Sequence, residues 1–144
     1  MNWIVLVMVL LAGAATSIQA GVNGALGKKV GIIEAALVSF LVGTLFLFVI
    51  FLFARKGNIQ NALEVPKWQL IGGALGAIYI MIMVNAVPRV GMATALITLI
   101  VGQMTTSLLI DHFGLIGDKV IPIDLKKIGG LILMGMAIYL FYKK

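Results

Sequence analysis

Two apolar stretches of this sequence contain uncharged polar side chains at helical spacing. Gln19 and Asn23 lie four residues apart in the first, and Gln103 and Ser107 lie four apart in the second, with Thr106 beside them. Residues at i and i+4 share one face of a helix. A primary amide has two donor hydrogens and an acceptor oxygen that need partners. We interpret the two glutamines as contacts to a small polar solute or as hydrogen bonds between helices.

Other polar residues of the apolar stretches need no ligand to be explained. Tyr79 is a candidate solute contact, and the alternative is a tyrosine within a packed core. A hydroxyl on a helix often donates to the carbonyl four residues earlier. We expect this bond for five residues: Thr16, Ser17, Thr94, Thr98 and Thr105.

Three charged residues near the ends of apolar stretches are candidates for ion coupling or for contacts between copies. Glu34 begins one stretch, where we expect it to meet Lys28 or Lys29 among lipid headgroups; proton coupling is the alternative. Asp111 lies near a helix end, at the negative pole of the helix dipole, and needs compensation. That compensation comes from backbone N–H groups of the following turn, or from Lys28, Lys29 or Arg89 of a second copy.

The sequence argues against an enzyme and against nucleic-acid binding. No serine or histidine has a neighbour at the spacing of a nucleophile and its base, and the absence of cysteine excludes thiol chemistry. We expect no metal and no cofactor. The net charge of +6 comes from residues at the ends of apolar runs, which is typical of headgroup anchors. No charged residue lies at the centre of a run, so a bound solute is expected to be neutral or zwitterionic.

The composition requires a lipid environment for these residues, since 62% of the side chains are hydrophobic and the mean hydropathy is +1.15. A bilayer core of about 30 Å needs roughly 20 apolar residues per helix. Five uncharged or weakly charged runs approach that length: 3–25, 32–53, 68–87, 92–110 and 125–142. The sequence predicts an all-α integral membrane protein with five transmembrane helices in one domain, residues 1–144, and without an internal repeat.

The basic residues are divided almost evenly between the two membrane faces. One face has six: Arg55, Lys56, Lys67, Lys119, Lys126 and Lys127. The other has five: Lys28, Lys29, Arg89, Lys143 and Lys144. Because the distribution of Lys and Arg sets orientation, this balance permits insertion in both directions. We predict an antiparallel homodimer of ten helices, and a single fixed orientation is the alternative.

Small residues four positions apart predict close helix packing. Gly72 and Gly76 form such a pair in the third span, and Ser39 and Gly43 form one in the second. Small side chains let helix backbones approach each other in a bilayer. The pattern does not distinguish packing within one copy from packing between copies.

Several stretches resemble the half-size, five-helix branch of the drug/metabolite transporter superfamily, whose members are described as inner-membrane exporters. They are "SIQAGVNGALGK", "ALVSFLVGTL", "GGALGAIYI", "VPRVGMATAL" and "GQMTTSLLIDHFGL". The resemblance implies a multi-pass protein of the bacterial cytoplasmic membrane, in a family with paired and fused antiparallel copies. We therefore predict a secondary transporter of a small polar metabolite or drug-like solute, working by alternating access at a midplane site. A dual-topology channel for a small ion, or a structural subunit without transport, is the alternative.

Overall fold

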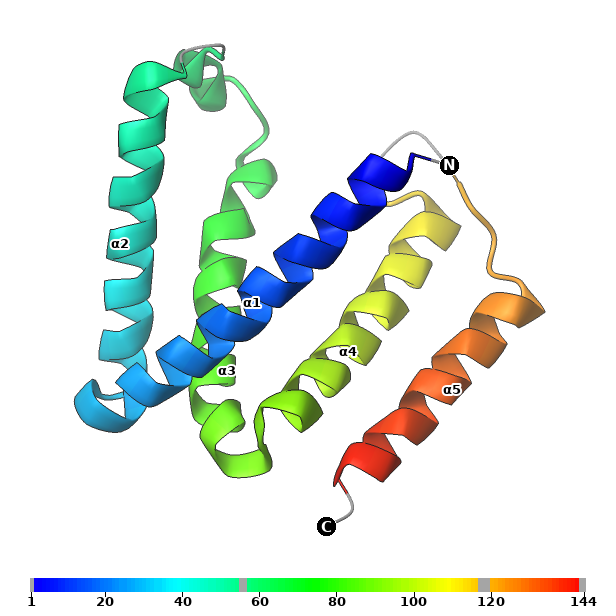
Figure 1. The fold of residues 1–144 in the computed structure, drawn as a ribbon. Helices are drawn as coiled ribbons and strands as arrows, with labels where there is room; N and C mark the ends of the chain where they lie inside the picture. The colour runs from blue at the N-terminus through cyan, green and yellow to red at the C-terminus, as the bar shows by residue number, and fades with distance from the viewer. Residues whose placement is uncertain (1, 55–56, 117–119, 143–144) are drawn as a thin grey trace. The chain divides into compact units, whose positions relative to one another are not determined.

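The computed structural model describes residues 2–54, 57–116 and 120–142, which form helices and their connections without a strand (Figure 1). Five α-helices in this part of the chain are long and apolar enough to cross a membrane. They are α1 (Trp3–Val30), α2 (Ile32–Phe53), α3 (Gly72–Val90), α4 (Met92–Phe113) and α5 (Leu125–Tyr142). The predicted all-α fold is confirmed for the described residues, with five helices that are long and apolar enough to span a membrane.

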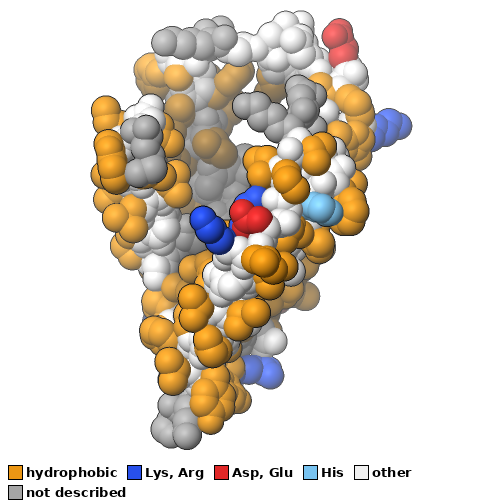
Figure 2. All heavy atoms as spheres, turned by 90° about the vertical axis from the view of Figure 1, so that its right-hand side faces the viewer, with side chains coloured by type: hydrophobic (Ala, Val, Ile, Leu, Met, Phe, Trp, Pro, Cys, Tyr) orange, Lys and Arg blue, Asp and Glu red, His pale blue; other side chains and the backbone are white. Residues whose placement is uncertain are grey.

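The surface of these helices is apolar, as contact with lipid requires. Leu10 on α1 is 74% exposed and Phe53 on α2 is 86% exposed, and α5 has no buried residue. Figure 2 shows hydrophobic side chains spread along the helices on the face that it presents, with charged side chains at only a few places. In water such a surface would aggregate, whereas in a bilayer it is solvated by acyl chains.

Three helices, α1, α3 and α4, extend beyond their predicted C-terminal ends. The helix α1 continues past residue 25 to Val30, and its last turn contains Lys28 and Lys29. Cations are stabilised at the negative pole of a helix, and their aliphatic stems reach the headgroups while the backbone stays helical. Charges therefore marked the edge of the lipid-facing part of α1 rather than the end of the helix.

The connection between α2 and α3 contains two short 3₁₀ helices, η1 (Ile59–Leu63) and η2 (Lys67–Ile71). The side chain of Asn58 begins η1 by accepting the N–H of Gln60 at 3.0 Å. The third predicted span therefore starts with a 3₁₀ turn before α3 begins at Gly72. Arg55 and Lys56, which contribute to the charge balance, lie outside the described residues, as do Lys119, Lys143 and Lys144.

A single glycine separates α1 from α2, and another separates α3 from α4. Gly31 has φ 105° and ψ 161°, and Gly91 has φ 85° and ψ 154°. Residues other than glycine rarely adopt a positive φ, so both positions favour glycine. The surrounding sequences share three of seven residues, in "KVGIIEA" at 29–35 and "RVGMATA" at 89–95. This similarity is too short to form a repeat unit, and the expectation of no internal repeat stays a prediction.

The chain falls into two compact units, Met1–Arg89 and Val90–Lys144. The core of the first joins Ala35 and Ala36 of α2 to Ile80 and Val84 of α3. Val84 also covers Gly27 of α1 so closely that a Cβ atom added to this glycine would overlap the valine side chain. Close approach at small residues therefore assembles the first unit, as expected for helices in a bilayer.

In the second unit α4 and α5 pack in antiparallel directions, with hydrogen bonds near both ends. At one end the hydroxyl of Thr94 donates to the carbonyl of Phe141 at 3.2 Å. At the other end the N–H of Ile121 donates to the carbonyl of Asp111 at 2.9 Å. The connection that leads into α5 is thus held along the end of α4.

The predicted small-residue pairs have different surroundings within the chain. A Cβ on Gly76 would lie 3.2 Å from the Phe40 ring, whereas nothing lies within 4 Å of a Cβ on Gly72 or Gly43. Ser39 is bonded to α1. One member of each pair therefore packs within the chain, and the other faces space that lipid or another copy can fill.

Candidate functional site

Two glutamine side chains lie near the middles of their helices and are exposed. Gln103 stands at the centre of α4, which runs from Met92 to Phe113, and Gln19 lies within one turn of the centre of α1. Neither amide makes a hydrogen bond within the described part of the chain. An unpaired amide at hydrocarbon depth is costly, so both need a partner from outside this chain's described residues.

Asn23 has a partner on the neighbouring helix. It is buried, and its Nδ2 donates to the hydroxyl of Ser39 on α2 at 3.1 Å. This hydrogen bond joins α1 to α2 next to Gly24. A Cβ atom added to Gly24 would lie at van der Waals distance from the Val87 side chain of α3. Asn23 therefore holds helices together, and its predicted contact with a solute stays a prediction.

Three of the five hydroxyl groups predicted to bond to their own helix do so. Thr16, Thr98 and Thr105 donate to the carbonyls four residues earlier at 2.7 to 2.8 Å, as predicted. The same prediction is wrong for Thr94, whose hydroxyl donates to α5 instead. The pattern could not reveal this, because the acceptor is a helix-end carbonyl 47 residues away in the sequence.

The polar row of α4 is exposed in the second unit. Gln103, Thr106, Ser107 and Asp111 all present accessible surface, and no side chain among these four is hydrogen-bonded to a described residue. Thr105 lies on the partly covered side of α4. The polar row is therefore available to a solute, to water or to another protein surface.

The end of α4 is organised by its backbone and by a histidine rather than by the Asp111 carboxylate. Gly114 terminates the helix in the left-handed conformation at φ 61°, and the N–H of Leu115 donates to the carbonyl of Ile110 at 3.1 Å. The Nδ1 atom of His112 accepts the N–H of Ile123 at 3.3 Å, which requires an imidazole without a proton on that nitrogen.

The predicted bond from the turn's N–H groups to the Asp111 carboxylate is wrong. Only the main-chain oxygen of Asp111 accepts a bond among the described residues. Among the described residues the carboxylate therefore has no compensating partner at the negative helix pole, and a cation from a second copy is the other predicted source.

The remaining candidates belong to the first unit. Glu34 lies in the first turn of α2 with its carboxylate folded over Gly31, and it forms no ion pair with Lys28 or Lys29 in the described structure. Tyr79 is half-buried and packs against the hydrophobic core. Arg89 is exposed in the last turn of α3. Among the described residues, no three His, Asp or Glu side chains are placed to bind a metal together.

Comparison with known families gives one match that covers nearly the whole chain. The model of the family described as "Putative inner membrane exporter, YdcZ" matches residues 4–140. Searches of curated proteins and of solved structures returned no match. The matched range includes all five helices except the first residue of α1 and the last two residues of α5, and it includes every candidate site residue described above.

Proposed function

The chain belongs to this inner-membrane exporter family, and from that premise we propose that it is a secondary transporter of a small polar solute. The observation that carries the proposal is the pair of mid-helix amides, Gln19 and Gln103, that have no partner among the described residues. Such groups are retained in a bilayer where they face a water-filled cavity or a ligand. The solute is neutral or zwitterionic, because the middle of each helix lacks a charged residue to balance a net charge.

We further propose that two copies in opposite orientations enclose the solute and alternate between openings on the two sides of a bacterial inner membrane. Consecutive spans cross a membrane in opposite directions, so in this arrangement the C-terminal ends of α3 and α4 would lie on opposite membrane faces. Arg89 at the end of α3 therefore reaches the membrane face of Asp111 only in an oppositely inserted copy. Both side chains are exposed without a described partner, which supports an ion pair between copies.

Comparison of exported solutes tests the transporter proposal. Cells producing the wild-type chain are compared with cells producing the Gln19→Ala, Gln103→Ala double variant by mass-spectrometric profiling of the medium. The expected result is a polar solute that accumulates outside wild-type cells and exchanges across vesicles containing purified wild-type protein. The double variant should lose both activities.

Gln60→Ala is the matched control, because it removes an exposed amide from η1 outside the five membrane-spanning helices. Its export should equal that of the wild type. If the double variant still exports the solute, the two amides do not contact it. A passive ion conductance far above carrier turnover would support the channel alternative instead.

The antiparallel arrangement requires two measurements. A reporter at the C-terminus should show comparable numbers of copies ending on each side of the membrane. Asp111→Arg and Arg89→Asp should each weaken the purified dimer, and the double reversal should restore it. A single orientation, or a double reversal as weak as the single variants, would exclude the proposed pairing.

A further inference from the structure

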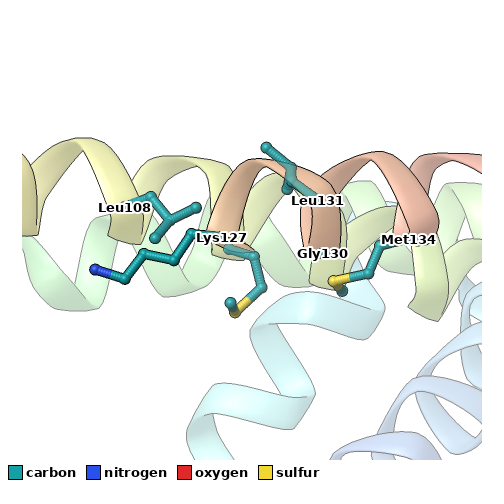
Figure 3. Close-up of a pocket in the computed structure, with 6 residues that line it drawn as sticks. Leu108, Lys127, Gly130, Leu131 and Met134 are labelled. Atoms are coloured by element: carbon teal, nitrogen blue, oxygen red, sulfur yellow. The ribbon is translucent and has the colours of Figure 1, made fainter. Parts of the chain in front are cut away.

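The second unit contains an apolar groove between α4 and α5. Its cavity volume is about 140 Å³, and its lining is almost wholly hydrocarbon and methionine sulfur. The lining residues are Met104, Leu108, Lys127, Gly130, Leu131 and Met134. Figure 3 shows the Lys127 side chain extended beside Leu108, with its nitrogen at the end of the site away from Met134. The groove thus has a lysine ammonium at one end and is apolar along the rest of its length.

The groove exists because α5 carries glycine where it passes α4. Nothing lies within 4 Å of a Cβ added to Gly130 or to the adjacent Gly129. A glycine that packs tightly against a partner helix would show close contacts there, as Gly27 does against Val84. Gly130 therefore leaves a gap that another molecule can occupy.

The depth of the cation matches the headgroup region of a bilayer. Lys127 is the third residue of α5, which begins at Leu125, and Met134 lies seven residues further along the helix. At 1.5 Å per residue the groove descends about 10 Å from the lysine into the hydrocarbon. Lysine near a helix end extends toward the phosphates while its stem lies on apolar surface.

The ammonium group retains binding capacity. Its Nζ donates to the carbonyl of Pro122 at 2.7 Å, which leaves two of its three hydrogens for another acceptor. The nearby carboxylate of Asp124 accepts the backbone N–H of Lys127 at 2.8 Å and so caps α5. Lys126 and Lys127 balance the carboxylates of Asp111 and Asp124 at this end of the two helices, so an anion is attracted by the free hydrogens of the Lys127 ammonium and not by a net local charge.

We propose that this groove binds an anionic phospholipid, with the phosphate on Lys127 and part of one acyl chain beside Gly130. A lysine ammonium at headgroup depth above an apolar lining matches the charge and form of an anionic lipid, and a second copy in the groove is an outcome that the test distinguishes. The site does not depend on the proposed transport activity, since it uses none of the predicted solute contacts.

Native mass spectrometry of the detergent-purified chain tests the proposal. The probes are phosphatidylglycerol and phosphatidylcholine with identical acyl chains, and glycerol phosphate as a source of phosphate without acyl chains. The wild type should form phosphatidylglycerol adducts in preference to phosphatidylcholine. Lys127→Gln should reduce the phosphatidylglycerol adduct about fivefold, since a basic residue near anionic lipid contributes about 1 kcal/mol. Glycerol phosphate should not bind.

Two matched controls separate this groove from general attraction to the basic helix end. Lys126→Gln removes the same charge from a residue that does not line the groove, and it should have a smaller effect. Gly130→Leu should fill the groove and abolish the lipid preference, whereas Gly135→Leu changes an equally open glycine outside it. Unchanged elution from a sizing column shows that each variant is folded.

Three results would overturn the proposal. Equal losses for Lys126→Gln and Lys127→Gln would indicate a diffuse surface charge. Glycerol phosphate binding as well as the lipid would indicate a phosphate site without an acyl chain. A Gly130→Leu variant that loses its dimer while keeping the lipid preference would show that a second copy occupies the groove.

Discussion

The contact between Gly27 and Val84 predicts opposite outcomes for two similar substitutions on α1. In Gly27→Ala the new methyl group overlaps a Val84 side chain that is only 2% exposed. In Gly13→Ala nothing lies within 4 Å of the new methyl group. Both glycines lie inside α1, so the two variants differ chiefly in what surrounds the added carbon.

The size of the expected stability change is set by packing. A span that stays helical in detergent gains the higher helix propensity of alanine in both the folded and the unfolded state, so this gain largely drops out of the free energy of unfolding. Overpacking of a close-packed contact costs about 1–3 kcal/mol. We therefore expect Gly27→Ala to lower the free energy of unfolding by that amount. Gly13→Ala should change it by less than about 0.5 kcal/mol, as is usual for a residue without close neighbours.

The assay is equilibrium unfolding in mixed dodecylmaltoside and SDS micelles, with the wild type and the variants measured side by side. Val84→Ala provides an internal test, because it removes the atoms that the new methyl group overlaps. The Gly27→Ala, Val84→Ala double variant should be more stable than the sum of the single losses implies, with an interaction energy of about 0.5–3 kcal/mol. Additive losses, or a Gly27→Ala variant as stable as Gly13→Ala, would refute the contact between α1 and α3.

Three further predictions concern single hydrogen bonds and one turn. A double-mutant cycle with Asn23→Ala and Ser39→Ala should give a coupling of about 0.6 kcal/mol and at most about 1.7, measured by the same unfolding assay; export lost without any coupling would place Asn23 at the solute instead. Gly114→Ala should destabilise the protein by about 1–2 kcal/mol, because alanine is strained at φ 61°, and an unchanged unfolding midpoint would argue against this turn. Thr94→Val should lower the free energy of unfolding by about 0.6 kcal/mol, since its hydrogen bond joins α4 to α5. Thr105→Val removes only a hydrogen bond within α4 and should have a smaller effect. Equal losses for the two variants would contradict a stabilising role of the bond between the helices.

The fold was predictable because it depends on hydropathy, which can be summed residue by residue along the sequence. Each span is a run of apolar side chains long enough for the bilayer, and run length needs no tertiary information. The helix ends were less predictable, since α1 continues through Lys28 and Lys29 where hydropathy declines. Gly31 was not predicted as a turn, because a positive φ is a conformational requirement that hydropathy does not record.

The candidate site was partly predictable for a different reason. The cost of an unpaired amide in hydrocarbon follows from chemistry alone, so Gln19 and Gln103 could be identified from their types and positions. Which polar residues already have partners depends on distant segments. The bonds from Asn23 to Ser39 and from Thr94 to Phe141 cross between helices, and no local pattern specifies such pairs.

The helix α4 combines two environments that would conflict on a single face. Gln103 belongs to the polar row, and the next residue, Met104, lines the apolar groove. Successive residues on a helix point about 100° apart, so Gln103 and Met104 face different directions. A second copy that covers Gln103 can therefore leave Met104 exposed to lipid. The mixed composition of residues 101–111 is explained by this division, since the polar positions need protein or solute and the apolar positions need hydrocarbon.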